Sequence, residues 1–360
     1  MNPNKKVRVA IICGGISSER EVSLKSGKQV LTHLDPVRYE SQLIEIASNG
    51  QWLLQGAQTP LQLDISQGDG HQLVPVSDNS DLTLSVCPFD VVFIALHGQF
   101  GEDGRIQALL DMLRIPYTGS SVFASSLCMN KAQTRNLITG IGVSVPHFFT
   151  IFHRSIPTLE ELDKRISKEI LYPCIIKPNE SGSSIGISLV TSKEMLADAL
   201  ASAFAEDQVV LVEQYIRGRE ITCGVLGNSS VGGDLMVLPP VEILPDGVFF
   251  DYNAKYNSTE TKEICPAPLE PKEAEDVKRL ASQIHARIGC DGLSRSDFIL
   301  CDGTFYFLET NTIPGLTEQS LCPKEAAAAG MTFGEFLGKQ IELALEKNHD
   351  PRPPSRHSHQ

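Results

Sequence analysis

Four polar residues in the last quarter of the chain have the types and the spacing of a metal and phosphate site. Arg295, Asp297, Glu309 and Asn311 flank an apolar segment that is typical of two strands joined by a tight turn at 301–303. Two carboxylates and an amide oxygen are the hard ligands that Mg²⁺ takes, usually alongside waters and nucleotide phosphates. A neighbouring arginine would neutralise charge on a transferring phosphoryl group.

The length of the turn decides whether these side chains share one face of the hairpin. Side chains alternate along a strand, so a two-residue loop would place Asp297 opposite Leu308 and turn Glu309 to the other face. A three-residue loop, closed by Gly303 in the left-handed conformation, pairs Asp297 with Phe307 and brings all four onto one face. We therefore predict the three-residue loop. The competing interpretation, an acidic hairpin end with an internal ion pair, explains each residue singly but not four on one face.

The composition is that of an ordinary globular protein long enough for two or three domains. The chain has 360 residues, of which 41% are hydrophobic and 21% charged. Its net charge of −13 argues against nucleic acid as a partner. We predict neither a signal peptide nor a membrane span, because no apolar run has the required length. Nine cysteines, scattered without a C-x-x-C pair, indicate reduced thiols in a cytoplasmic protein.

Two apolar runs in the first third of the chain are typical of buried strands in a parallel sheet. These runs are Val9–Cys13 and Val91–Leu96. Glu19 lies in the turn after the first run, where a helix begins, and a favourable interaction with the helix dipole explains it locally. His97 follows the second run, at the sheet edge where open α/β sheets bind ligands. For His97, a structural and a functional role are equally supported.

Two lysines indicate a bound nucleotide phosphate. Lys131 begins a helix, where the dipole disfavours a cation unless an anion compensates, although a solvated lysine is an alternative. Lys177 ends a buried strand and is followed by a Gly/Ser-rich loop, 178–186, which resembles a phosphate-covering flap and contains Ser184 as a cofactor-binding candidate. A phosphate-covering flap is therefore a better interpretation of this loop than a plain hairpin.

Further residues suit the other parts of a nucleotide. Glu213 and Glu220 lie seven positions apart across a turn between strands, where acids accept from an adenine amine and from ribose hydroxyls. Each by itself would be an ordinary strand-end charge. The polar, aromatic segment 250–257 is a candidate lid.

Taken together, these segments resemble the ATP-grasp superfamily and, within it, the D-alanine–D-alanine ligase family. Nine runs occur in the family's order: GGISSEREVSLKSG, ALHGQFGEDG, IPYTGS, MNKAQTR, IIKPNESGSSIG, VEQYIRGRE, YNAKY, SRSDF and LETNTIPGLTEQSLCP. The resemblance implies α/β and α+β architecture, an ATP-grasp fold preceded by an open parallel-sheet domain. The implied parts are an N-terminal domain, a central ATP-binding domain, a C-terminal catalytic domain and a disordered tail: 1–119, 120–216, 217–347 and 348–360.

The resemblance also implies an activity, the ATP-dependent ligation of two D-alanines for peptidoglycan precursor synthesis. The first D-alanine carboxylate would attack the γ-phosphorus of ATP, giving an acyl phosphate and releasing ADP. The amine of the second D-alanine would then attack that carbonyl and expel phosphate. ATP and two Mg²⁺ ions, or Mn²⁺, are the implied cofactors. A cytoplasmic homodimer is the implied state, with small-molecule substrates and neither nucleic acid nor membrane as a partner.

The resemblance assigns roles to individual residues. The nucleotide contacts would be Lys131, Lys177, Ser184, Glu213, Ile216, Glu220 and Lys255. The substrate contacts would be Glu19, His97, Arg295, Ser320 and Leu321. The catalytic set would be Glu19, Ser183, Tyr256, Arg295, Gly315 and Ser320, and the metal ligands Asp297, Glu309 and Asn311. Asn130 departs from the family, which usually has Asp before the lysine.

Two alternatives stay open. A sister ligase would make D-alanyl-D-lactate or D-alanyl-D-serine, although Tyr256 resembles what D-alanine-selective members carry. A protein of a different class, a non-catalytic ATP-binding regulator, would have no need of Arg295 together with the three metal ligands. An NAD-dependent oxidoreductase is disfavoured because the glycine fingerprint is missing.

Overall fold

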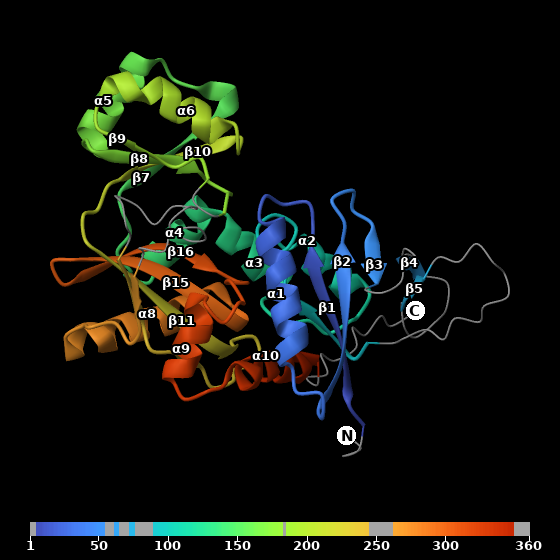
Figure 1. Cartoon of the computed structure of the whole chain (residues 1–360). Helices are drawn as coiled ribbons and strands as arrows, with labels where there is room; N and C mark the ends of the chain where they lie inside the picture. Colours follow the sequence, from blue (N-terminus) through green and yellow to red (C-terminus); the bar gives the residue numbers. More distant parts are fainter. Residues whose placement is uncertain are drawn as a thin grey trace, which may run out of the picture.

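The computed structural model describes residues 5–54, 61–64, 72–75, 89–182, 185–244 and 262–348. Three larger sheets, each packed against helices, and one two-stranded sheet organise this part of the chain (Figure 1). Several predicted features lie outside the described residues: Ser183, Ser184, Lys255, Tyr256, the lid segment 250–257 and the tail after Asn348.

The first sheet contains both predicted apolar strands. Its strands are β1 (Val7–Gly14), β2 (Tyr39–Ile46), β3 (Trp52–Leu54) and β6 (Val91–Ile94). Its helices are α1 (Arg20–His33) and α2 (Arg105–Met112). The separate two-stranded sheet consists of β4 (Leu61–Asp64) and β5 (Gln72–Pro75). The order is β3-β2-β1-β6, with β1 parallel to both neighbours and β3 antiparallel at the edge. Residues Val9–Cys13 have no exposed surface, as expected for a central parallel strand. The predicted open parallel sheet is confirmed.

The second sheet is antiparallel and carries Lys177, the lysine predicted to bind phosphate. Its elements are β7 (Phe148–Phe152), a 3₁₀ turn η1 (His153–Ser155), α5 (Leu159–Glu169), β8 (Cys174–Pro178), β9 (Ser188–Val190), a 3₁₀ turn η2 (Lys193–Met195), α6 (Leu196–Phe204) and β10 (Val209–Gln214). The strand order is β7-β10-β8-β9. In Figure 1 this sheet and its two helices form a lobe above the third sheet. The register pairs Leu211 with Lys177, so Glu213 lies diagonally across from Lys177 on the same face.

The third sheet carries the predicted metal hairpin. Its strands are β11 (Arg219–Asn228), β12 (Met236–Val237), β13 (Val241–Leu244), β14 (Lys262–Ile264), β15 (Asp291–Cys301) and β16 (Thr304–Asn311). Its helices are α3 (Val122–Met129), α4 (Lys131–Thr139), α8 (Pro271–Ile288), α9 (Leu321–Ala328) and α10 (Phe333–Asn348). The order is β14-β13-β11-β15-β16, with β12 paired to β11 and β16 at the edge.

The hairpin turn is shorter than predicted, and a β-bulge offsets the change in strand register that the shorter turn causes. Cys301 pairs directly with Thr304, so the loop has two residues, Asp302 at φ 49° and Gly303 at φ 73°. Positive φ at both positions is typical of a type I′ turn. The predicted three-residue loop is therefore wrong. A register shift lower in the ladder leaves Leu308 as an extra residue.

That extra residue restores the parity on which the site depends. Below the shift, Asp297 lies opposite Glu309 and Arg295 lies opposite Asn311. The prediction that these four side chains share one face is confirmed, although a bulge achieves it and not the turn.

The hydrophobic cores show how the parts are joined. One cluster runs from β1 and β6 to Leu293 of β15 and to Phe336 and Ile341 of α10. The first and third sheets therefore share a core. A second cluster packs α3 and α8 against the third sheet, whereas the second sheet has a core built from its own strands and helices. The lobe that carries Lys177 is thus the most independent part of the described chain.

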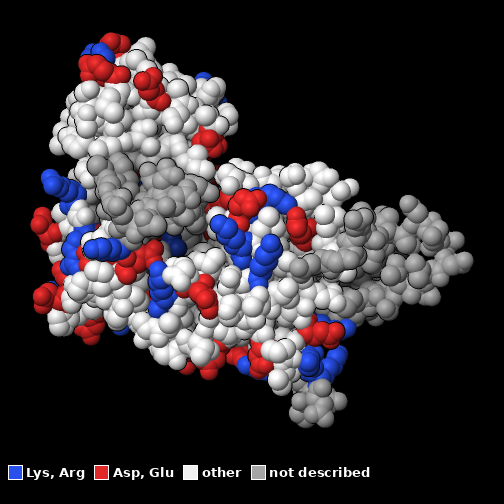
Figure 2. Space-filling view, in the orientation of Figure 1, with Lys and Arg blue, Asp and Glu red and all other residues white. Residues whose placement is uncertain are grey.

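One face of the molecule shows how charged side chains are distributed. On the face shown in Figure 2, Lys and Arg side chains alternate with Asp and Glu, without the basic stretch that nucleic acid binding requires. None of the helices in the described ranges has both the length and the apolar character needed to cross a membrane.

Candidate active site

Asp297 is the centre of a buried polar network at the open end of the hairpin. The Arg295 guanidinium donates from Nε and Nη2 to the two carboxylate oxygens, each at 2.8 Å. Thr222 Oγ1 and Asn311 Nδ2 donate to the same carboxylate at 2.5 and 3.0 Å. Burial disfavours the charge on Arg295, but the Asp297 carboxylate overcomes this and raises the pKa of the guanidinium well above its usual value. The network therefore holds a permanent cation beside the proposed ligands.

Lys131 joins the hairpin to the flap. Its Nζ lies 3.2 Å from Glu309 Oε2 and donates to the Ser181 carbonyl at 2.6 Å. Lys131 is the first residue of α4, and Asn130 caps that helix by accepting from Gln133 N at 3.0 Å. Asn130, the departure from the family pattern, thus still supplies the cap. The structure places a lysine at a helix N-terminus, as predicted.

A second buried ionic group lies on the second sheet. Lys177 Nζ donates to Glu213 Oε1 at 2.8 Å, and Arg135 of α4 donates to Glu213 Oε2. Burial lowers the pKa of Lys177 to about 8, against the opposing effect of Glu213. Sequence reasoning assigned no role to Arg135. The available signal was its place four residues after Lys131, on the same side of one helix.

Glu19 stands where two glycine-containing loops meet. It precedes α1 and is 7% exposed. A Cβ atom added at Gly98 would lie 2.3 Å from its Oε2, and one added at Gly182 would lie 2.9 Å from it. Both backbones therefore approach this carboxylate closely, and at Gly98 the positive φ of 70° also favours glycine. The structure brings Glu19 together with the loop after β6 and the start of the flap.

His97 has a partner at each ring nitrogen. Its Nδ1 lies 3.0 Å from the Ile313 carbonyl oxygen, which can only accept, so Nδ1 carries the proton. Nε2 then accepts from the Ser26 hydroxyl at 2.8 Å. Burial lowers the pKa of His97, which favours this neutral form. The side chain joins α1 to the segment after β16, and its proximity to substrate stays a prediction.

Glu102 is a second functional candidate that sequence reasoning missed. Its two carboxylate oxygens accept from Gly98 N at 2.8 Å and from Ile313 N at 3.2 Å. Burial and the Glu19 carboxylate raise the pKa of Glu102 to about 8. The residue ties the loop after β6 to the segment after β16. Its position in the ALHGQFGEDG run was visible, but the long-range backbone partners were not.

The predicted second-substrate residues lie together at the N-terminus of α9. Ser320 is the N-cap residue, and its Oγ accepts from Thr317 N at 3.2 Å. A Cβ atom at Gly315 would lie 2.9 Å from that Oγ. Leu321 is the first residue of the helix and is buried. The backbone N–H groups of a helix N-terminus suit a substrate carboxylate.

Glu325, on the same helix, binds the backbone of β11, the strand paired with β15. Its Oε1 accepts from Gly224 N at 3.1 Å, and Gly224 is paired with Arg295 in the register. Burial raises the pKa of Glu325 to about 7, and Arg295 opposes the shift. This buried acid connects α9 to the strand beside Arg295 and had no signal in the sequence.

The two remaining described nucleotide candidates lie where the chain passes from the second sheet to the third. Ile216 follows β10 and Glu220 is the second residue of β11, and both are half-buried. Glu220 is paired with Ile243 and Ile299, so it belongs to the third sheet while Glu213 belongs to the second.

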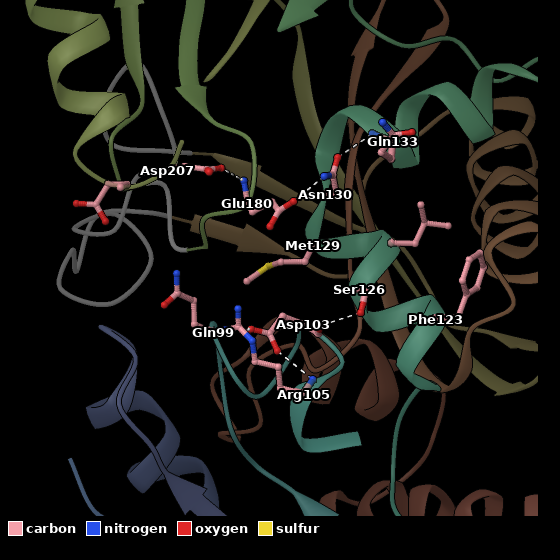
Figure 3. A pocket seen from close by; sticks show the side chains of 12 residues that line it. Gln99, Asp103, Arg105, Phe123, Ser126, Met129, Asn130, Gln133, Glu180 and Asp207 are labelled. Carbon is pink, nitrogen blue, oxygen red and sulfur yellow. Dashed lines mark hydrogen bonds and ion pairs between the residues drawn. The ribbon is translucent and has the colours of Figure 1, made fainter. Parts of the chain in front are cut away.

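A polar cavity of about 420 Å³ adjoins α4 (Figure 3). Residues from three parts of the chain line it, among them Gln99, Asn130, Gln133, Glu180 and Asp207. Across it, Asn130 Nδ2 donates to Glu180 Oε1 at 2.6 Å, and Glu180 N donates to Asp207 Oδ2 at 2.7 Å. Among the site candidates that the structure describes, none lines this cavity, which lies where the second-sheet lobe meets the rest of the described chain.

Comparison with known proteins identifies the family. The model of the D-ala D-ala ligase N-terminus matches residues 8–120, and that of the D-ala D-ala ligase C-terminus matches residues 137–342. The chain belongs to the D-alanine–D-alanine ligase family. A curated D-alanine–D-alanine ligase from Caldicellulosiruptor bescii is 37% identical over 357 residues, which cover 95% of this chain and 96% of that one.

Solved structures agree with this assignment and with the ATP-grasp fold. The VanG D-Ala:D-Ser ligase from Enterococcus faecalis matches with a TM-score of 0.82 and 31% identity, over 94% of this chain and 100% of that one. The D-alanine–D-alanine ligase from Bacillus anthracis complexed with ATP matches with a TM-score of 0.71 and 28% identity, over 95% and 98%. The chain is therefore an ATP-grasp enzyme of an ATP-using ligase family.

Proposed function

We propose that this chain joins two D-alanines to D-alanyl-D-alanine at the expense of ATP. Family membership makes a ligase the leading function, and one structural observation carries the proposal. Arg295, Asp297, Glu309 and Asn311 lie on one face of the hairpin, and Lys131 bridges that face to the flap. Cations and hard oxygen ligands on one side of an ATP-grasp fold are what phosphoryl transfer from ATP to a carboxylate requires.

The ligands present fit Mg²⁺ in their chemistry. Asp297, Glu309 and Asn311 offer carboxylate and amide oxygens, and the two acids are paired with Arg295 and Lys131. In the described ranges no three His, Cys, Asp or Glu side chains gather into a ready-made metal site. Mg²⁺ would therefore depend on nucleotide phosphates for further ligands, as it commonly does. When bound, it would neutralise charge on those phosphates.

The chain's own residues would orient the two substrates. The Glu19 carboxylate would hold the ammonium group of the first D-alanine, next to Gly98 and Gly182. The N-terminus of α9, at Ser320 and Leu321, would hold the carboxylate of the second. The acyl phosphate would then form between these two points.

Arg295 would stabilise negative charge in both steps. Its guanidinium is fixed by Asp297 and keeps its proton at every working pH. The Gly315 backbone, close to Ser320, would share the charge of the tetrahedral intermediate. Exclusion of water would protect the acyl phosphate from hydrolysis, and the flap and the segment 250–257 are the elements proposed to do this.

The first experiment measures phosphate release and dipeptide formation with purified protein, ATP, Mg²⁺ and D-alanine. Parallel reactions replace D-alanine with L-alanine, or add D-lactate or D-serine. We expect phosphate and D-alanyl-D-alanine in equal amounts with D-alanine alone. Preferential incorporation of D-serine would favour the activity named for the VanG neighbour. ATP binding without turnover of any D-amino acid would support the regulatory alternative.

Several finer assignments belong to this proposal. We propose the three-domain division at 119 and 216, which the separate core of the second sheet supports for the central domain, while α3 and α4 pack against the third sheet. A homodimer in the cytoplasm is proposed from family resemblance. Lys131 and Lys177 are proposed for nucleotide phosphates, with Glu213 and Glu220 for adenine and ribose.

A further inference from the structure

The β-bulge of β16 is held from outside its own sheet. Leu308 is the extra residue in the ladder between β15 and β16. Its carbonyl oxygen accepts two hydrogen bonds from Arg135, from Nε at 3.1 Å and Nη2 at 3.0 Å. The preceding residue, Phe307, donates its N–H to the Ser144 carbonyl at 2.9 Å. At the bulge, these backbone groups on the edge of β16 thus find hydrogen-bond partners on α4 and on the segment after it.

The position of the bulge decides the face on which the proposed metal ligands lie. Removing one residue from a strand turns every following side chain to the opposite face. Without the extra Leu308, Glu309 and Asn311 would point away from Asp297. A contact that fixes the bulge therefore fixes the geometry of the metal ligands.

Arg135 also reaches the phosphate lysine. It has no exposed surface, and its third donor nitrogen, Nη1, binds Glu213. Glu213 in turn accepts from Lys177 at 2.8 Å. Two cations and one carboxylate make this buried group positive, which suits an anionic ligand. One guanidinium thus connects the bulge on the third sheet with the lysine on the second.

We infer that Arg135 is a positioning residue that fixes the bulge at Leu308 and couples the ligand face of Glu309 and Asn311 to the Glu213–Lys177 pair. The planar fork of arginine allows two nitrogens to bind one carbonyl while the third binds a carboxylate. A lysine has a single nitrogen, which cannot reproduce that geometry. The inference deepens the proposed function, because it concerns the same nucleotide and metal site.

The test compares Arg135→Met and Arg135→Lys with the unaltered protein. Calorimetry measures the dissociation constant of a non-hydrolysable ATP analogue with Mg²⁺ and with EDTA. The ratio of the two constants is the gain in affinity that Mg²⁺ provides. We expect Arg135→Met to reduce this gain by about 10-fold to 100-fold, as is usual when a group that orients metal ligands is removed. Arg135→Lys should restore part of it.

Lys347→Met is the matched control for loss of a buried cation. Lys347 donates to the Gly119 carbonyl at 2.6 Å, and burial lowers its pKa. It lies on α10, away from the hairpin ligands. We expect this variant to lower the melting temperature and to leave the gain from Mg²⁺ unchanged.

A normal Mg²⁺ gain in folded Arg135→Met, with a loss of stability like that of the control, would overturn the inference. If Arg135→Met does not fold, Arg135→Lys decides, and a full Mg²⁺ gain in that variant has the same meaning. Binding is measured without turnover, so the outcome is separate from the ligase assay. A protein that binds Mg²⁺ and nucleotide but makes no dipeptide would refute the proposed function and leave this inference intact.

Discussion

Replacing Asp297 with asparagine should cost both stability and turnover, for one electrostatic reason. The carboxylate accepts two hydrogen bonds from Arg295, one from Thr222 and one from Asn311. An amide keeps one acceptor oxygen and adds an NH₂ group that must face a donor. The side chains of Arg295 and Asp297 are only 11% and 9% exposed, so water cannot replace the lost charge.

The size of the loss follows from the burial of the pair. Removing one partner of a buried ion pair leaves an uncompensated charge and costs about 3–5 kcal/mol. We therefore expect Asp297→Asn to lower the free energy of unfolding by about that amount. Turnover should fall by roughly a hundredfold or more, because a strong stabiliser of developing charge is misplaced. Arg295→Ala should lower turnover to a similar extent.

The assays are urea unfolding followed by circular dichroism, and steady-state phosphate release at saturating ATP and D-alanine. Glu242→Gln is a matched control. Arg219 binds Glu242 through two nitrogens at 2.7 and 2.8 Å, but the Arg219 side chain, which would lose its charged partner, is 38% exposed. Solvent should limit the loss in that variant to about 1 kcal/mol or less. If Asp297→Asn unfolds at the same urea concentration as the unaltered protein, or turns over within threefold of it, the network does not have the role described here.

Three further predictions concern buried groups. Glu102→Gln should lower the free energy of unfolding by about 1–3 kcal/mol, because the new amide NH₂ leaves Gly98 N or Ile313 N without an acceptor; an unchanged urea midpoint would contradict this. Burial lowers the pKa of His285 to about 4, so the unfolded state binds more protons between pH 6.5 and 4, and stability should fall by roughly 3 kcal/mol as the pH drops through that range. His285→Gln should remove this part of the pH dependence of the free energy of unfolding. Parallel pH profiles of stability for the two proteins would refute the role of His285. Nucleotide affinity should fall by about tenfold per pH unit above pH 8, where Lys177 loses its proton, whereas Lys177→Arg should flatten the profile; unchanged binding up to pH 10 would exclude Lys177 as the phosphate cation.

The sequence by itself determined the elements and the chemistry of the site. Continuous apolar runs identified β1 and β6 because a central parallel strand is buried on both faces. The residue types at 295, 297, 309 and 311 predicted hard oxygen ligands and a cation, and the resemblance of nine sequence runs to a family predicted the substrate. These signals depend only on neighbouring residues, or on the order of short runs along the chain.

Only the tertiary structure decided the parity of the hairpin. Asp302-Gly303 forms the two-residue turn that its residue types favour, so the turn alone would have separated Glu309 from Asp297. The bulge at Leu308 reverses this, and Arg135, 173 positions earlier in the chain, holds it. Nothing within the hairpin encodes that contact.

The same reason explains the residues that sequence reasoning missed. Arg135, Glu102 and Glu325 act on backbone atoms of Leu308, Gly98, Ile313 and Gly224, and backbone atoms are alike at every position of a sequence. A buried charged side chain becomes recognisable only when folding places it against a particular carbonyl or N–H group and removes water from both. Residue types thus fix which chemistry is available, and long-range packing fixes which groups are held in place to perform it.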